Sequence, residues 1–371
     1  MAKLTLAIPC LFGLESLVAD ELRYQGMAEN LRIETGRVLV DGDERSIVKA
    51  NLLLRTAERV YVLMGEFPAP SFDALFEGVK ALEWERLIDR SGKFPIKASS
   101  LDSVLKSVPD CQRIVKKAVA TRLGNAYRTE TLLEIGASYQ IRLFLMKDRA
   151  SLYLDTSGMS LHKRGWRESS NQAPLRETLA AAMVKLSRFK GKEAFLDPFC
   201  GSGTIAIEAA LAARNIAPGI DRSFSAEQWT SIPKKLWYEE SEAARSREYH
   251  GEYRIFASDI DPAAVALAKH NARLAGVEED IEFTVADALT RDLPEASGTL
   301  ITNPPYGDRI LNAAQAEALY RAMGRHWKGC SDWKFYVLTS SLDFEKSFGS
   351  KASKRRKLYN GMIPCQLYMF F

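Results

Sequence analysis

A short segment, Asn303-Pro-Pro-Tyr306, combines residue types that could hold a flat ring bearing an amino group. It follows an apolar run, Thr299–Thr302, which is typical of a buried strand. The two prolines lack backbone N–H donors, so nearby carbonyl groups are left as free acceptors. Asn303 adds an amide oxygen, and Tyr306 adds an aromatic face. The pattern predicts a polar socket beside a stacking surface, with a simple proline-rich turn as the alternative.

A glycine-containing segment, Asp197-Pro-Phe-Cys-Gly-Ser-Gly-Thr204, lies between a predicted buried strand at 193–196 and a predicted helix at 205–214. Gly201 and Gly203 would let backbone N–H groups approach a ligand at the carboxyl end of a parallel strand. The segment lacks the lysine of a P-loop and the third glycine of a dinucleotide fingerprint. We therefore expect a nucleoside without a pyrophosphate. The carboxylate of Asp197 would attract an ammonium group, and S-adenosylmethionine carries an ammonium, a sulfonium and a ribose.

A bound ribose needs an acidic side chain at the end of the next strand. Asp259 follows a predicted strand at 253–257, and Asp261-Pro262 is a typical start for the predicted helix at 263–275. Asp221 is an alternative, 24 residues after Asp197 and near the usual spacing of about 20, but no strand precedes it. We prefer Asp259, with Asp261 as cap and second candidate contact. Residues 215–252 then form a helical insertion without an assigned role, and Asp287, after a predicted strand at 281–285, is placed to accept from an adenine amine.

Basic residues are concentrated in the middle of the chain. The net charge of the 371 residues is only +4, but residues 105–166 carry eleven Lys/Arg and five acidic residues, a balance of +6. This segment could bind phosphates through a predicted basic helix at 111–124 that contains Lys116 and Lys117. The predicted linker at 158–172 contains His162-Lys-Arg-Gly-Trp-Arg167, which could grip phosphate and stack a base. A solvated basic face, and a linker whose Trp166 packs on the next domain, remain alternatives. A second basic cluster at 351–357 includes Arg355 and Arg356.

Several classes of protein are disfavoured. No apolar run approaches the roughly 18 residues that span a membrane, and the N-terminus does not resemble a secretory signal. The five cysteines are scattered and contain no C-x-x-C pair, which argues against a disulfide framework and a zinc site. We expect a cytoplasmic protein that contains no metal and contacts no membrane.

The order of predicted elements indicates a fold of the α/β class. Residues 1–64 alternate strands and helices in a small α+β layer, and residues 65–160 form a second α+β unit. Residues 161–371 predict a doubly wound, mostly parallel sheet that ends in an antiparallel hairpin at Asn360-Gly361.

The segments at 197–204 and 303–306 together resemble the class I S-adenosylmethionine-dependent methyltransferases of exocyclic amines. The segment Asp155-Thr-Ser-Gly-Met-Ser-Leu-His-Lys-Arg-Gly-Trp166 resembles the end of an RNA-binding THUMP domain and its junction. Nearly the whole chain is similar to the THUMP-containing guanine-N2 methyltransferases of large-subunit ribosomal RNA. This resemblance implies a ferredoxin-like domain at 1–64, a THUMP domain at 65–160, and a Rossmann-like methyltransferase domain with a seven-stranded sheet at 161–371.

The resemblance also implies roles for particular residues and a partner, the 23S ribosomal RNA or its assembly intermediate. The cofactor would contact Asp197, Pro198, Phe199, Cys200, Gly201, Ser202, Gly203, Thr204, Asp259, Ile260, Asp261, Asp287, Ala288 and Asn303. The target base would be held by Asn303, Pro304, Pro305 and Tyr306. RNA would contact Lys116, Lys117, His162, Lys163, Arg164, Trp166, Arg167, Arg355 and Arg356. Adenine-N6 methylation of RNA, and a non-catalytic role in RNA binding or ribosome assembly, remain alternatives.

Overall fold

The computed structural model describes residues 3–167, 175–305 and 312–371. The chain forms two compact units, which are described separately. The N-terminal unit contains Met1–Cys10, Val18–Leu161 and Arg222–Ala243. The C-terminal unit contains Leu11–Leu17, His162–Asp221 and Ala244–Phe371. The assignment of residues 222–243 to the N-terminal unit differs from the predicted domain order, in which they belong to the methyltransferase domain.

A single seven-stranded sheet runs through the N-terminal unit, in the order β2-β3-β1-β4-β7-β6-β5. Among the strand pairs of the described residues in this sheet, β5–β6 is parallel and the others are antiparallel. Because β4 pairs with both β1 and β7, the predicted boundary at residue 64 falls inside a strand. The strands are β1 (Leu4–Pro9), β2 (Arg32–Glu34), β3 (Arg37–Gly42), β4 (Tyr61–Pro68), β5 (Ile96–Leu101), β6 (Ile141–Met146) and β7 (Arg149–Asp155). The helices are α1 (Glu15–Tyr24), α2 (Glu44–Leu53), α3 (Phe72–Lys80), α4 (Val108–Tyr127) and α7 (Lys234–Arg245).

Side chains complete the ends of two helices in this unit. Asp43 is the N-cap of α2: its carboxylate accepts from the Ser46 N–H, and the Ser46 hydroxyl accepts from the Asp43 N–H in a capping box. Helix α3 ends at Lys80. The buried indole of Trp84 donates to the carbonyl of Val79 at 2.8 Å, which satisfies an acceptor at the helix end, and a short 3₁₀ turn follows.

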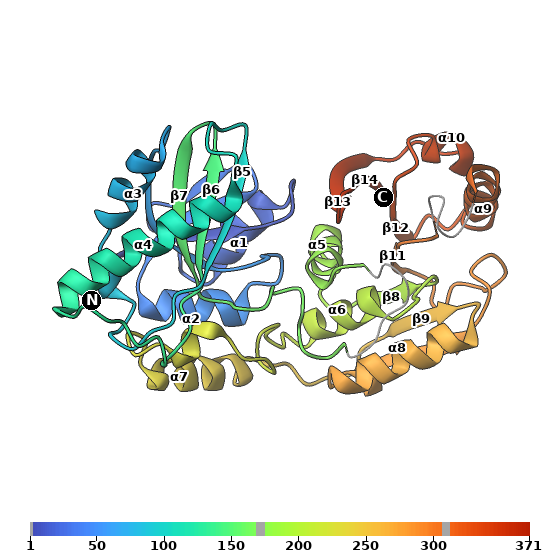
Figure 1. The fold of residues 1–371 in the computed structure, drawn as a ribbon. Coiled ribbons are helices and arrows are strands. Elements are labelled where there is room, and N and C mark those ends of the chain that lie inside the picture. Colours follow the sequence, from blue (N-terminus) through green and yellow to red (C-terminus); the bar gives the residue numbers. More distant parts are fainter. Residues whose placement is uncertain (1–2, 168–174, 306–311) are drawn as a thin grey trace. The chain divides into compact units, whose positions relative to one another are not determined.

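Part of the 215–252 insertion completes the N-terminal unit. Its Trp229 is 1% exposed and stacks on Tyr139 with ring centroids 4.8 Å apart. The indole N–H of Trp229 donates to the carbonyl of Ser138 at 3.0 Å. On α7, Glu239 and Glu240 form ion pairs with Arg45 of α2, and Figure 1 shows α7 beside α2. The insertion is partly helical, as expected, and it packs on a sheet that precedes it in the sequence.

The C-terminal unit has the expected doubly wound sheet, in the order β10-β9-β8-β11-β12-β14-β13. The first five strands are parallel, and β14 and β13 are antiparallel. The strands are β8 (Ala194–Asp197), β9 (Ile255–Asp259), β10 (Ile281–Val285), β11 (Gly298–Thr302), β12 (Trp333–Thr339), β13 (Lys354–Asn360) and β14 (Ile363–Phe370). The helices are α5 (Glu177–Ser187), α6 (Thr204–Ala213), α8 (Pro262–Leu274), α9 (Ala313–His326) and α10 (Phe344–Phe348).

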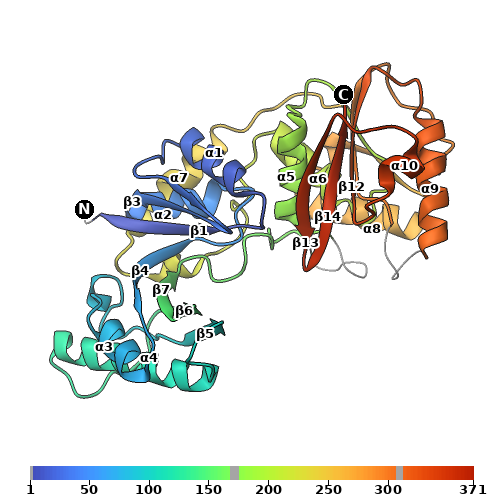
Figure 2. The ribbon, with the colours of Figure 1, turned by 90° about the horizontal axis from the view of Figure 1, so that it is seen from above.

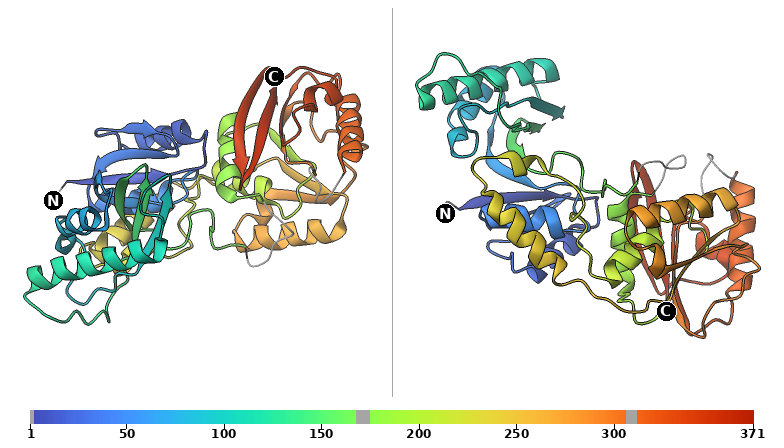
Figure 3. Two further views of the ribbon diagram at one scale, coloured as in Figure 1. Left: turned by 45° about the horizontal axis from the view of Figure 1, so that its top comes forward. Right: turned by 90° about the horizontal axis from the view of Figure 1, so that it is seen from below.

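Helices cover both faces of this sheet. Figure 2 shows α5 and α6 on one side and α9 and α10 on the other. Buried side chains of α9, β12 and α10, among them Tyr320, Trp327, Phe335 and Phe344, form one apolar cluster with Leu300 of β11. The β13–β14 hairpin, dark red in Figure 3, turns at Gly361 with φ +65°, in agreement with the predicted Asn360-Gly361 turn. Among the described residues, no helix is both long and apolar enough to cross a bilayer.

The packing of the insertion leads to a stability prediction. Trp229→Ala should lower the free energy of unfolding by about 3–5 kcal/mol, because it empties a fully buried aromatic site. Tyr238→Ala is the matched control, since Tyr238 lies on α7 but is 68% exposed, and it should change stability by less than about 0.5 kcal/mol. Urea unfolding monitored by circular dichroism measures both. Equal, small effects of the two substitutions would contradict the packing role.

Candidate active site

The glycine segment forms a loop at the carboxyl end of β8 and leads directly into α6. Gly201 has φ +52°, and a Cβ atom built on it would meet nothing within 4 Å. Gly203 has φ +82°, and its Cβ would lie 3.0 Å from the Cβ of Ala268. The first glycine therefore presents bare backbone to open space, whereas the second allows a helix to pack closely. Both positions need the left-handed backbone conformation that glycine adopts at low cost.

Most of the other side chains of the loop are buried. The side chains of Pro198, Cys200, Ser202 and Thr204 are buried, and that of Phe199 is half-buried. Burial raises the pKa of the Cys200 thiol well above its usual range, so a thiolate nucleophile is disfavoured there. The structure keeps the predicted segment together but leaves its backbone, rather than most of its side chains, available to a ligand.

Asp197 is the most perturbed carboxyl group of the site. It is 1% exposed, and its Oδ1 accepts from the Thr302 hydroxyl at 2.9 Å and from the Phe199 N–H at 3.3 Å. Its buried Oδ2 has no donor among the described residues. Burial, partly offset by these hydrogen bonds, raises the pKa of Asp197 to about 7. A buried carboxyl oxygen without a donor suits a cationic ligand group such as an ammonium.

Asp259, at the end of β9, faces the same loop. Its Oδ2 accepts from the Gly201 N–H at 2.9 Å, and its Oδ1 accepts from the Asp261 N–H at 3.1 Å. Each oxygen keeps a second lone pair for a ribose hydroxyl. Asp261 caps α8, as expected, by accepting from the Ala263 N–H at 2.9 Å. Asp221, the alternative, lies after α6 and forms an ion pair with Arg245 at 3.5 Å.

Apolar and acidic groups continue along the same edge. Ile260 is 68% exposed directly after β9, and Val285, which pairs in register with Asp259, is 51% exposed at the end of β10. Exposed aliphatic side chains at neighbouring strand ends can pack on the face of a purine. Asp287 accepts from the Leu289 N–H at 2.9 Å through one oxygen, and the other oxygen remains for an amine. Ala288 is buried.

The Asn303 segment lies at the tip of β11, next to the glycine loop. Strand β11 pairs with β8 in parallel, and Thr302 bonds directly to Asp197. Asn303 is half-buried, and its Oδ1 is buried without a donor among the described residues. Pro304 is buried and Pro305 half-buried. Tyr306, the predicted stacking residue, lies outside the described residues. The structure therefore brings an unsatisfied amide acceptor and an unsatisfied carboxyl oxygen to the same edge of the sheet.

Sequence reasoning missed the groups that hold this edge in place. Besides Thr302, the fully buried Asn271 of α8 donates to the Ser202 carbonyl at 3.0 Å. Arg167 donates to the Thr204 hydroxyl and lies 3.4 Å from Glu177 of α5. Arg164 and Glu208 of α6 form an ion pair at 3.0 Å with both side chains almost fully buried. The basic character of 162–167 signalled Arg164 and Arg167, but it pointed to another role.

The RNA contact predicted for part of that segment is therefore wrong. Arg164 and Trp166 are buried, so RNA cannot reach them in this fold, and burial lowers the pKa of Arg167 despite its carboxylate neighbours. Trp166 packs inside, as the alternative interpretation held. His162 is half-buried and Lys163 is exposed. A buried cation needs a partner, and the acidic partners here come from α5 and α6, which a local sequence pattern does not reveal.

The remaining predicted RNA contacts differ in availability. Lys117 is exposed. Lys116 is half-buried and forms an ion pair with Glu134 at 2.6 Å. Arg355 is exposed and lies 3.4 Å from Glu345. The Arg356 guanidinium donates to the Gly13 carbonyl and to the Ser16 hydroxyl. Lys117, Lys163 and Arg355 are thus the most accessible cations of the predicted set.

The site fits the predicted cofactor. Gly201 borders open space, Asp197 has an oxygen for an ammonium, Asp259 has lone pairs for a ribose, and Ile260 is exposed beside them. These features match the parts of S-adenosylmethionine in order along the sheet edge. Among the described residues, no group of three or more His, Cys, Asp or Glu side chains could hold a metal ion.

The raised pKa of Asp197 predicts pH-dependent cofactor binding. Below pH 7 the free protein holds this carboxyl protonated, so binding of a cationic ligand must displace a proton. S-adenosylmethionine should bind roughly five- to tenfold more weakly at pH 6 than at pH 7.5. Calorimetric titration at both values measures this ratio. Asp197→Asn should bind weakly at both, with a flat profile. Persistence of the full pH dependence in Asp197→Asn would rule out this carboxyl as its source.

The contacts of Arg167 predict a positioning role. Arg167→Ala should weaken S-adenosylmethionine binding by about tenfold, because the loop loses a charge-assisted hydrogen bond at Thr204. Arg167→Lys should recover part of the loss. Lys163→Ala, which removes an exposed cation from the same segment, is the matched control and should bind normally. Calorimetry on variants with unchanged circular dichroism gives the result, and normal binding by Arg167→Ala would contradict the role.

Comparison with known proteins gives a consistent result. The model of the RMKL-like methyltransferase domain matches residues 164–369, that of the RlmL ferredoxin-like domain matches 5–61, and that of the THUMP domain matches 69–155. The chain is 43% identical over 374 residues to the "Putative RNA methyltransferase YpsC" of Bacillus subtilis, covering 100% of this chain and 97% of that protein.

Longer relatives and a solved structure agree. The ribosomal RNA large subunit methyltransferase K/L of Shewanella baltica is 34% identical over 366 residues, which are 96% of this chain but 52% of that protein. The chain thus spans about half the length of such K/L relatives. The crystal structure of SMU.472 in complex with SAH is 38% identical, covers 100% of this chain and 98% of that one, and superposes with a TM-score of 0.96. The protein belongs to the RMKL-like methyltransferase family, with a ferredoxin-like and a THUMP domain preceding its class I methyltransferase domain.

Proposed function

We propose that this protein transfers a methyl group from S-adenosylmethionine to the exocyclic N2 of a guanine in ribosomal RNA of the large subunit, in the cytoplasm. One observation carries the proposal. The unsatisfied amide oxygen of Asn303 and the unsatisfied carboxyl oxygen of Asp197 lie at the ends of the paired strands β11 and β8, which the Thr302–Asp197 hydrogen bond joins. An acceptor for the amine of a base and an acceptor for the ammonium of the cofactor thus share one edge.

The cofactor would lie over the glycine loop. Asp197 would accept from its ammonium, Asp259 from its ribose, and Asp287 from its adenine amine, with Ile260 against the purine. The likeness to a methyltransferase crystallised with SAH supports this placement. When bound, S-adenosylmethionine supplies an electrophilic methyl group on a sulfonium.

The target guanine would enter from the Asn303 side. Removing it from its stack costs a few kcal/mol, and stacking on an aromatic side chain such as Tyr306 returns about 1–3 kcal/mol. The Asn303 Oδ1 and the Pro304 carbonyl would accept the two amine hydrogens and turn the nitrogen lone pair toward the methyl group. Positioning of this kind can supply about 7–11 kcal/mol. No strong base is needed, because the methylated amine is acidic and releases its proton to water.

RNA as the substrate class is supported by the THUMP domain and by relatives named as ribosomal RNA methyltransferases. Adenine-N6 methylation of RNA is the second candidate, since an adenine presents a similar amine to the same acceptors. Mass spectrometry of digested ribosomal RNA from a deletion strain separates the two: loss of N2-methylguanosine supports the proposal, and loss of N6-methyladenosine supports the alternative. A null calorimetric titration with S-adenosylmethionine would favour a non-catalytic protein.

Asn303 gives the sharpest test of the mechanism. Asn303→Ala should lower methyl transfer by about 100-fold or more, as removal of a positioned polar group does in other enzymes, and should leave cofactor affinity nearly unchanged. Transfer of a tritiated methyl group to RNA measures the first, and calorimetry the second. Normal turnover by Asn303→Ala would contradict the proposed role of Asn303 in binding the target amine.

A further inference from the structure

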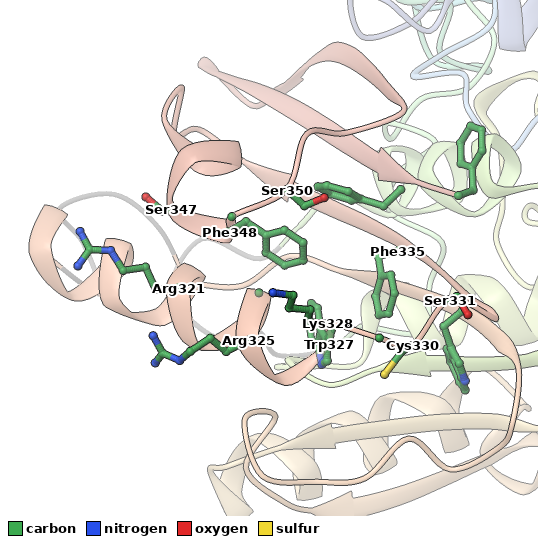
Figure 4. A pocket seen from close by; sticks show the side chains of 16 residues that line it. Arg321, Arg325, Trp327, Lys328, Cys330, Ser331, Phe335, Ser347, Phe348 and Ser350 are labelled. Carbon is green, nitrogen blue, oxygen red and sulfur yellow. The ribbon is translucent and has the colours of Figure 1, made fainter.

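A hollow lies in the C-terminal unit, at the opposite end of the strands from the candidate active site. It measures about 620 Å³ and is lined by the second half of α9, the start of β12, the end of α10 and the end of β14 (Figure 4). We call it the α9–α10 hollow. Trp333, at the start of β12, pairs with Gly298, the first residue of β11, whereas Asn303 follows the last. Five residues of strand, about 16 Å, separate the two sites.

The walls of the α9–α10 hollow are aromatic. Trp327 and Phe335 stack with ring centroids 5.4 Å apart, and Phe348 lies 6.2 Å from Trp327. Trp327 and Phe335 are buried, whereas Phe348 and Phe370, whose ring centroids lie 4.9 Å apart, are half-buried. Aromatic side chains that remain partly accessible in a hollow offer flat surfaces on which a base can stack.

The rim of the α9–α10 hollow is basic. Arg321, Arg325 and Lys328 project from α9 and the residues after it (Figure 4) and are exposed. Arg321 forms an ion pair with Glu317. Arg325 and Lys328 have no ion-pair partner among the described residues. Residues 321–357 as a whole carry ten Lys/Arg and three acidic residues, a balance of +7 that exceeds the +4 of the entire chain. Of these cations, Arg321, Arg325 and Lys328 line the hollow.

We propose that the α9–α10 hollow binds an unpaired nucleotide of the RNA substrate, with its base against the Phe348 and Phe370 side and its phosphates on Arg325 and Lys328. The inference rests on the proposed RNA substrate. Cations alone would also suit an acidic peptide, but cations beside accessible aromatic faces match the chemistry of single-stranded RNA, which offers phosphate and base together. RNA contacts at the candidate active site and at the α9–α10 hollow would suit a folded RNA that extends beyond its target base.

The test uses the full chain and a fluorescein-labelled single-stranded RNA oligonucleotide of mixed sequence, with affinity measured by fluorescence anisotropy over a range of salt concentrations. The Arg325→Ala/Lys328→Ala double variant removes two phosphate contacts, so its salt slope should fall by about 1.4. The matched control is Lys269→Ala/Arg273→Ala, which removes two exposed cations from α8. Phe348→Leu, which keeps an apolar side chain but removes the aromatic face, should bind about fivefold or more weakly. Tyr249→Leu, at an exposed aromatic of the same unit, is its control.

The outcomes are distinct. Weaker binding and a smaller salt slope in the Arg325/Lys328 variant, with the α8 variant unchanged, support the proposal. Equal effects of the two charge variants overturn it, as does normal binding by both the Arg325/Lys328 and Phe348 variants. A change in oligomeric state for Phe348→Leu with unchanged RNA affinity would assign the hollow to a second copy of the chain and also overturn it. If the wild-type protein binds RNA through the hollow but methylates no guanine, the proposed function fails and this inference stands.

Discussion

The hydrogen bond between the Thr302 hydroxyl and Asp197 Oδ1 ties together the two central strands of the catalytic sheet at the end where chemistry would occur. Both side chains are almost fully buried, so the bond forms in a medium where an unpaired polar group is costly. It leaves the second oxygen of Asp197 without a donor. This carboxyl oxygen without a donor favours the binding of a cationic ligand. The Thr302–Asp197 hydrogen bond also fixes the end of β11, which carries Asn303. This one hydrogen bond therefore helps to position both the proposed cofactor site and the proposed site for the target base.

The glycine loop depends on a support of its own, made of charged groups that are mostly buried. Arg164 pairs with Glu208 beneath α6, and Arg167 connects Thr204 of the loop with Glu177 of α5. Breaking one side of a buried pair strands an uncompensated charge, so these contacts favour one arrangement of the loop. Two glycines give the loop its unusual backbone, and the buried cations limit how far that backbone can move.

The two units are interlaced along the sequence. Residues 222–243 leave the catalytic sheet between α6 and β9 and complete the N-terminal unit with Trp229 and α7. The sheet of that unit also runs without a break from the ferredoxin-like strands into the THUMP strands through β4. A fragment cut at residue 161 would therefore lack part of the packing of its own unit. The insertion, which had no assigned role from its sequence, contributes to the core of the domain before it.

Local sequence patterns determined the class of fold, the order of strands and helices in the catalytic half, the glycine turn, the Asp261 cap and the Asn360-Gly361 hairpin turn, because each depends on residues a few positions apart. They also placed Asp197, Asp259 and Asn303 at strand ends, and parallel strands bring such ends to one edge. Tertiary structure alone decided which charges are buried. Arg164 and Lys163 are neighbours in the sequence, but the first is enclosed with Glu208 and the second is exposed. It also decided where the insertion packs and that Thr302 bonds to Asp197, because burial and partner choice depend on groups that are distant along the chain and meet only in the folded protein.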